Sequence, residues 1–166
     1  MSPTLHVIVG PCGAGKTTYA HDFARRSGAV AFVLDDWMAR LFGPDIPDPI
    51  EYAWMLERVA RCEAQIWATA AAAVATGTSV VFDIGLMRRD DRARVREIAA
   101  GADLALQFHF VDAPQAVRRA RVEGRNTIKG ETFAIDVSPE MFDFIEGVYE
   151  PPAPGELEGA IVSTSD

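Results

Sequence analysis

Four positions near the start of the chain have the residue types and the spacing of a site that binds phosphate. Within the stretch GPCGAGKTT, the pattern G-x-x-x-x-G-K-[ST] is met by Gly10, Gly15, Lys16 and Thr17. Glycines let successive backbone N–H groups turn toward an anion, and a helix that starts at the lysine points its positive dipole end at the same place. The Lys16 ammonium would then lie between the terminal phosphates of ATP, and the Thr17 hydroxyl would ligate the Mg²⁺ that bridges them.

The setting of this pattern supports the same interpretation. The apolar run LHVIV precedes it and a stretch of helical period follows it, which is the context that a phosphate-binding loop requires. A glycine-rich turn that matches by chance is the alternative, expected about once in two hundred chains of this length at average residue usage. We therefore predict that the loop wraps the phosphates. The predicted nucleotide-binding residues are Gly10, Cys12, Gly13, Ala14, Gly15, Lys16, Thr17 and Thr18.

Carboxylates follow two further apolar runs of strand length. Asp35 and Asp36 come at the end of VAFVL, and Asp83 comes directly after SVVF. Ligands of α/β sheets bind outside the carboxyl ends of the strands, so these side chains should face the triphosphate. We predict that Asp35 accepts the proton of an attacking hydroxyl group and that Asp36 and Asp83 help to hold Mg²⁺. A helix start at DDW, with Asp36 as its cap and Trp37 in the core, is the alternative.

Arginines gather after the fourth apolar run, between residues 118 and 125. Phosphoryl transfer passes through a loose transition state whose charge is spread over the equatorial oxygens, and an arginine carried by a closing lid can stabilise that charge. Arg119 and Arg125 are the predicted catalytic arginines, on a lid segment that spans about residues 118–137. A solvated helix face is the alternative for each of them.

These groups would be positioned by a parallel sheet, because apolar runs of strand length alternate along the chain with longer stretches of helical period. The predicted strands are residues 5–9, 30–34, 79–82, 104–111 and 160–164. The predicted helices are residues 16–27, 51–76 and 89–100, one that starts near Pro114, and one across VSPEMFDFIEGVY. Residues 123–139 are expected to be irregular, and PPAPGE is expected to form a turn. Since no linker divides the chain, we predict a single domain over residues 1–166.

The composition is that of a soluble globular protein, with no sign of a membrane segment. Hydrophobic residues make up 49% of the 166 residues and charged residues 24%, and every long apolar run is interrupted by polar residues. The formal net charge of −8 argues against a nucleic-acid partner, because binding to a phosphate backbone needs a basic surface. No signal sequence precedes the first strand, so the expected location is the cytoplasm. The oligomeric state is left open.

Five segments together resemble the small P-loop kinase-like ATPases of the zeta-toxin and polynucleotide-kinase group, which includes chloramphenicol phosphotransferase. They are GPCGAGKTTYA, LDD, SVVFD, FHFVDAP and FAIDVSPEMFDFIEGVYEPPAPGE, the last of which is most similar to AAA-type predicted kinases. The resemblance implies an α/β, three-layer P-loop NTPase fold with a five-stranded parallel sheet flanked by helices. It also implies ATP and Mg²⁺ as cosubstrates, an aspartate base at Asp35, and lid arginines approximated by Arg119 and Arg125. The polynucleotide kinases have an arginine two residues after LDD, where this sequence has Met38.

These features lead to one main hypothesis and two alternatives. The main hypothesis is a kinase that moves the terminal phosphate of Mg-ATP to a hydroxyl group of a small molecule. The alternatives are a 5′-hydroxyl polynucleotide kinase and an ATPase switch whose partner reads the nucleotide state. We predict an acceptor pocket between residues 34–49 and the long helix, lined by aromatic side chains. The alternative interpretation is that these aromatic side chains pack in the core. The predicted lining residues are Trp37, Phe42, Tyr52 and Trp54.

Overall fold

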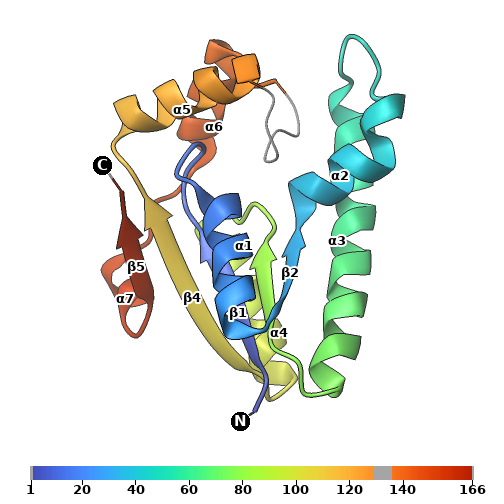
Figure 1. Ribbon diagram of the computed structural model, residues 1–166, viewed down its shortest axis with the longest axis vertical. Helices are drawn as coiled ribbons and strands as arrows, with labels where there is room; N and C mark the ends of the chain where they lie inside the picture. Colours follow the sequence, from blue (N-terminus) through green and yellow to red (C-terminus); the bar gives the residue numbers. More distant parts are fainter. Residues whose placement is uncertain (1, 129–135, 166) are drawn as a thin grey trace.

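The computed structural model describes residues 2–128 and 136–165. Within these residues, five parallel strands form one sheet in the order β2–β3–β1–β4–β5 (Figure 1). The strands are β1 (Thr4–Val9), β2 (Val30–Val33), β3 (Val80–Asp83), β4 (Ala105–Asp112) and β5 (Ile161–Thr164). The helical elements are α1 (Lys16–Ser27), α2 (Leu34–Phe42), the 3₁₀ turn η1 (Gly43–Asp45), α3 (Tyr52–Ala75), α4 (Arg89–Gly101), α5 (Gln115–Ile128), α6 (Pro139–Val148) and α7 (Pro154–Leu157). The predicted α/β fold with a parallel sheet is confirmed.

Helices cover both faces of the sheet, because each strand sends alternate side chains to its two sides. On β1, Leu5 joins the core that α3 and α4 complete, whereas Ile8 packs in the core on the side of α1. The buried stripe of α3 has a spacing of four residues and consists of Cys62, Ile66 and Ala70. The strands point toward the end of the sheet where α5 and α6 lie (Figure 1). None of the described helices is long and apolar enough to cross a membrane.

The ends of two helices follow the sequence signals closely. Gly15, with φ of 93°, leads into α1 at Lys16, and Gly28, with φ of 71°, ends the same helix. Both glycines adopt the left-handed conformation that other residues avoid. The side chain of Ser138 accepts a hydrogen bond from the Met141 N–H and so caps the start of α6. The local sequence thus determines where the phosphate loop meets α1.

The predicted boundary between the second strand and the chain after it is wrong. β2 ends at Val33 and α2 begins at Leu34, so Asp35 and Asp36 lie in the first turn of a helix. Carboxylates are stabilised at this position by the positive end of the helix dipole. Leu34 is buried and packs in the same core as β2. A helix thus starts at DDW, as the alternative interpretation has it, but Val33 and not Asp36 is at its N-cap. The catalytic role of Asp35 stays a prediction.

Two segments predicted to be irregular contain helix. α5 continues through residues 123–128, residues 136–138 are irregular as predicted, and residues 129–135 lie outside the described residues. PPAPGE leads into α7, which starts at Pro154 because proline suits the first turn of a helix.

A buried ion pair holds α7 against α4, and α7 leads directly into β5. Arg92 is fully buried, and it donates to Glu156 from Nε at 2.8 Å and from Nη2 at 3.0 Å. These hydrogen bonds lower the pKa of Glu156 to about 2. Because this folded-state pKa lies below that of the unfolded chain, the pair stabilises the fold at neutral pH. That contribution is lost as the pH falls from about 4 toward about 2.

Replacing Glu156 with glutamine should lower the free energy of unfolding by about 3 kcal/mol at neutral pH, because the Arg92 guanidinium loses its anionic partner while it stays buried. The difference from the wild type should shrink at about pH 3, where the wild-type pair is itself weakened. Chemical denaturation at both pH values measures this effect. The control is Glu158→Gln at an exposed position two residues further along the chain, and an equal loss in both variants would contradict the role of the ion pair.

Candidate active site

A cavity of about 500 Å³ lies in front of the N-terminus of α1. This volume is within the range of sites that hold small molecules. Its walls come from the phosphate loop, the first turn of α2, the chain after β3, and helices α5 and α6. The predicted site residues that line it are Cys12, Gly13, Gly15, Lys16, Thr17, Thr18, Asp35, Asp83 and Arg125. The predicted site residues outside its lining are Gly10, Ala14, Asp36 and Arg119.

Close packing makes glycine necessary at two positions of the phosphate loop. A Cβ atom at Gly13 would lie 2.5 Å from the Arg118 carbonyl oxygen, and one at Gly10 would lie 2.0 Å from the Val111 carbonyl oxygen. Gly13 also has φ of +77°, in the left-handed region. The loop therefore lies directly against β4 and α5, which fixes its path into α1.

Lys16, Thr17 and Asp83 form a polar end of the cavity. Thr17 Oγ1 donates to Asp83 Oδ2 at 2.8 Å, and Lys16 Nζ donates to the Pro11 carbonyl oxygen at 2.9 Å. Asp83 is only 7% exposed, and burial raises the pKa of its carboxyl group, against the opposing effects of the Lys16 ammonium and the Thr17 hydroxyl. A hydroxyl and a carboxylate supply the oxygen ligands that Mg²⁺ takes beside substrate phosphates, so Thr17 and Asp83 fit the predicted metal.

Replacing Asp83 with asparagine should stabilise the free protein and impair turnover. A folded-state pKa raised above the unfolded value means that the stability contribution of Asp83 is present at low pH and is lost as the pH rises through the folded pKa. Asp83→Asn removes this loss while keeping an acceptor for Thr17. We expect a higher midpoint of thermal unfolding at neutral pH, a difference that vanishes below about pH 4, and at least about tenfold slower Mg²⁺-dependent turnover. A variant that is less stable at neutral pH would contradict this account.

The adjacent carboxylates of α2 have different surroundings. Asp35 lines the cavity, whereas Asp36 Oδ2 lies 3.2 Å from Nε2 of His21 on α1. Consecutive residues of a helix lie about 100° apart around its axis, so neighbours in sequence face different partners. Asp35 thus faces the cavity, and its role as the base stays a prediction. Asp36 is paired with α1 outside the cavity lining, and its role as a Mg²⁺ ligand stays a prediction.

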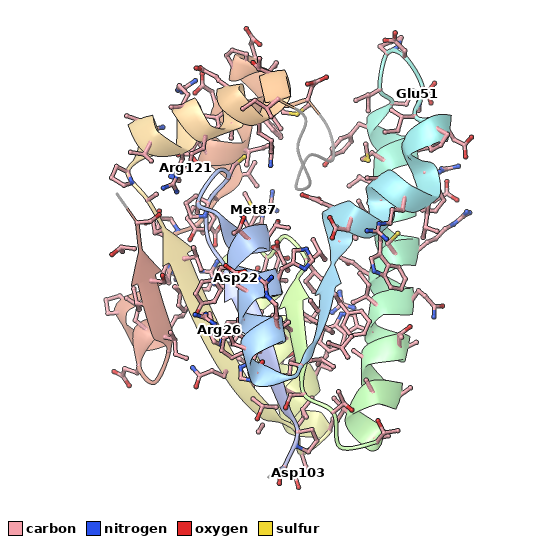
Figure 2. All side chains as sticks on the ribbon, viewed as in Figure 1. Asp22, Arg26, Glu51, Met87, Asp103 and Arg121 are labelled. Carbon is pink, nitrogen blue, oxygen red and sulfur yellow. The ribbon has the colours of Figure 1, made fainter. Side chains whose placement is uncertain are left out.

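The two predicted lid arginines, Arg119 and Arg125, have different surroundings. Arg125 lines the cavity, and its Nε is buried without a hydrogen-bond partner among the described residues. Arg119 instead donates to Asp143 on α6, and its guanidinium carbon lies 4.6 Å above the centre of the Phe142 ring. The arginine that lines the cavity besides Arg125 is Arg121, on the same helix (Figure 2). Arg125 therefore keeps its predicted place, and Arg119 packs against α6.

Sequence reasoning missed the role of Arg118. Its Nε donates to the Ala113 carbonyl oxygen at 2.9 Å and its Nη1 to the Cys12 carbonyl oxygen at 3.1 Å. Both of its terminal nitrogens also donate to the carboxylate of Glu146 on α6. The arginine thus joins the phosphate loop, the start of α5 and α6. Its spacing of four residues from buried Val122 was the available signal, since it assigns both to one helix face.

Replacing Arg118 with methionine should lower the free energy of unfolding by about 3 kcal/mol, because it leaves the half-buried Glu146 carboxylate and two carbonyl oxygens without their donor. Binding of Mg-ATP should weaken as well, since the loop loses its tie to α6. Chemical denaturation and calorimetry measure the two effects. The control Arg119→Met removes a more exposed pair and should change stability by less than about 1 kcal/mol; similar effects of both variants would contradict the assigned role.

The aromatic residues predicted to line an acceptor pocket lie elsewhere. Trp37 and Phe42 pack against the main core, and the Trp54 ring packs edge to face on Phe42 with centroids 6.3 Å apart. Tyr52 is 72% exposed. None of the four lines the cavity. Core packing is thus the correct interpretation for Trp37 and Phe42, and apolar residues of α6 line the cavity instead.

His109 is packed, as its position within a strand indicates. It is fully buried on β4, with Nε2 at 3.0 Å from His6 Nδ1 and Nδ1 at 2.9 Å from the Tyr19 hydroxyl on α1. Burial, together with the neighbouring His6, lowers the pKa of His109 to about 4. His6 and His109 therefore pack between the sheet and α1, as part of the core.

Solved structures with this fold include several kinases. A candidate kinase from Chloroflexus aurantiacus aligns with a TM-score of 0.76 at 20% identity, over 99% of this chain and 89% of that chain. The APS kinase CysC of Mycobacterium tuberculosis, in complex with AMPPNP and APS, aligns with a TM-score of 0.62 at 20% identity, over 99% and 90% of the two chains. A gluconokinase from Sinorhizobium meliloti aligns with a TM-score of 0.58 at 20% identity, over 98% and 83%. These similarities establish the fold.

The family assignment rests on most of the sequence. No curated protein matches the chain. Residues 5–152 match the family AAA_33, described as an AAA domain, and this range contains the phosphate loop, the two carboxylates of the cavity, and helices α5 and α6. The match agrees with the predicted resemblance to AAA-type kinases. The chain therefore belongs to the AAA_33 family of AAA domains, with the fold of the P-loop kinase-like ATPases.

Proposed function

We propose that this protein is a kinase that transfers the terminal phosphate of Mg-ATP to a hydroxyl group of a small-molecule acceptor. The observation that carries the proposal is that Asp35, Lys16 and the Thr17–Asp83 pair line one cavity. A nucleotide-dependent switch needs the phosphate loop and a metal ligand, but it has no need of a further carboxylate in the same cavity. Asp35 therefore favours a transferase.

Each residue has a distinct task in this reaction. The loop amides and the Lys16 ammonium bind the phosphates. Thr17 and Asp83 would hold Mg²⁺, which would neutralise negative charge on the phosphates. Asp35 accepts the hydroxyl proton while the acceptor oxygen bonds to the γ-phosphorus, and the bond from that phosphorus to the β–γ bridging oxygen breaks to leave ADP. Arg125 supplies positive charge to the transferring group.

The structural relatives support the same class of reaction. The proteins that share the fold are named as a gluconokinase, a sugar kinase and an APS kinase, and the APS kinase was solved with AMPPNP, an analogue of ATP. Their acceptors are small molecules. The net charge of −8 supports a small-molecule acceptor over an oligonucleotide.

Acceptor-dependent release of ADP tests the proposal. A panel of hydroxyl-bearing metabolites and antibiotics is screened together with a 5′-hydroxyl oligonucleotide, with Mg-ATP at saturation. We expect at least one small molecule to raise the rate of ADP release about tenfold above basal hydrolysis in the wild type, and not in Asp35→Asn. Salt-sensitive phosphorylation of the oligonucleotide would support a polynucleotide kinase instead. A protein partner captured with ATP but not with ADP, and no acceptor, would favour a switch.

A further inference from the structure

One face of α6 lines the cavity with apolar side chains. These side chains, spaced by three and four residues as on one helix face, are Met141, Phe144, Ile145 and Val148. Phe144 is 66% exposed and Met141 is 37% exposed. Solvent-exposed apolar side chains that line a cavity can be buried by packing against a ligand.

One end of this apolar wall is tied to the chain that follows β3. The Glu150 N–H donates to the Met87 carbonyl oxygen at 2.9 Å, which ties the end of α6 to the chain just after β3. Met87, which is labelled in Figure 2, and Val148 both line the cavity, as does Asp83, the predicted metal ligand at the end of β3. Phe144 lies one helical turn, about 6 Å, further along α6. The Val148 end of this wall is thus the end tied to the chain that follows Asp83, and Phe144 and Met141 lie further from that tie.

The polar groups of the cavity leave little for the acceptor beyond one hydroxyl group. Of the described polar side chains that line it, those of the phosphate loop and Asp83 are assigned to the nucleotide and its metal, and Arg125 is assigned to the transferring group. Arg121 donates to Ser165. Asp35 is the carboxylate that remains for an acceptor. A polyol would bury several hydroxyl groups against α6 without partners, at a cost of about 1–3 kcal/mol for each.

We propose that the acceptor is an alcohol with an apolar body of about the size of a ring, which packs on the α6 face while its hydroxyl group reaches Asp35. This inference rests on the proposed kinase activity and specifies its substrate class. The hydroxyl proton passes to Asp35 as the oxygen bonds to the γ-phosphorus, and ADP leaves. An aromatic or alicyclic alcohol fits this arrangement, whereas gluconate and glycerol do not.

Steady-state kinetics with defined alcohols tests the inference. The probes are 3-phenylpropan-1-ol and cyclohexylmethanol, compared with glycerol and gluconate, and the proteins are the wild type, Phe144→Ala, Met141→Ala and the control Ile98→Ala on α4, outside the cavity. We expect the ring alcohols to stimulate ADP release more than the polyols do. Phe144→Ala should raise the KM for a ring alcohol about tenfold and the KM for ATP less than about twofold, with a smaller effect in the same direction for Met141→Ala. Ile98→Ala should match the wild type.

Several results would overturn the acceptor class while leaving the kinase proposal intact. One is Asp35-dependent transfer to gluconate or glycerol in preference to the ring alcohols. Another is a KM for ATP that rises in Phe144→Ala while the KM for the alcohol does not, because the wall would then hold the nucleobase. An unchanged KM for the ring alcohols in both α6 variants would do the same. By contrast, failure to bind Mg-ATP, or no Asp35-dependent transfer to any alcohol, would count against the proposed function itself.

Discussion

Replacement of Asp35 by asparagine is expected to lower the rate of phosphoryl transfer by about 10²–10⁴-fold while the Kd for Mg-ATP stays within about twofold of the wild-type value. Asparagine has nearly the same shape, but it cannot take the proton of the attacking hydroxyl group. Asp35 lines the cavity on α2, apart from the loop residues that would bind the phosphates. Single-turnover kinetics and calorimetry measure the transfer and the affinity separately.

The neighbouring carboxylate provides a matched control for this variant. Asp36→Asn makes the same chemical change one position along α2, at a side chain that faces His21 rather than the cavity. Because Asp36 is paired with His21, we expect the change to slow transfer by less than about tenfold, and a larger loss would support the predicted role of Asp36 as a Mg²⁺ ligand. A greater loss of transfer in Asp36→Asn than in Asp35→Asn would reverse the assigned roles. Equal loss of transfer and of ATP affinity in Asp35→Asn would show that Asp35 acts in nucleotide binding and not as a base.

Replacement of Lys16 by alanine is expected to lower kcat/KM for ATP by about 10²–10³-fold, with a weaker affinity for Mg-ATP as part of the loss. Its ammonium donates to the Pro11 carbonyl oxygen within the loop, from where it can reach a bound phosphate. The hydrogen bond that its side chain donates stays within the loop, so the variant should keep its fold. Circular dichroism checks the fold, and calorimetry together with ADP release measures the functional loss.

A cation at the opposite end of the same helix provides the control. Arg26 lies in the last turn of α1, far from the phosphate loop (Figure 2). Arg26→Ala removes the same charge from the protein, so it separates a local contact from a general loss of positive charge. It should change kcat/KM for ATP by less than about twofold. Comparable losses in Lys16→Ala and Arg26→Ala would contradict the phosphate-binding role of Lys16.

Local signals were enough to predict the fold and the phosphate loop. Short apolar runs predicted β1, β3 and β4, and the structure has strands there. The glycines at positions 15 and 28 predicted the two ends of α1. The loop pattern is equally local, because its glycines, Lys16 and Thr17 need only the strand before them and the helix after them. The partnership of Thr17 and Asp83 follows from the parallel sheet, which brings the ends of β1 and β3 together.

The parts that sequence reasoning missed depend on contacts between distant segments. An arginine on α5 can face the cavity, the solvent or another helix. Arg119 faces α6 because it donates a hydrogen bond to Asp143 on that helix. Arg118 connects the phosphate loop to α6 because Glu146 on α6 accepts its hydrogen bonds. Likewise, the position of the apolar wall depends on how α6 is tied to the chain after β3, which no periodicity in the sequence encodes.

Titration calorimetry with Mg-AMPPNP tests the central claim most directly, since that claim is that the phosphate loop holds a triphosphate nucleotide beside Asp35. The account predicts saturable, stoichiometric binding to the wild type that weakens by at least about tenfold in Lys16→Ala and when Mg²⁺ is removed, and that persists in Asp35→Asn. An absence of binding to the wild type, or binding that is indifferent to Lys16 and to Mg²⁺, would contradict it.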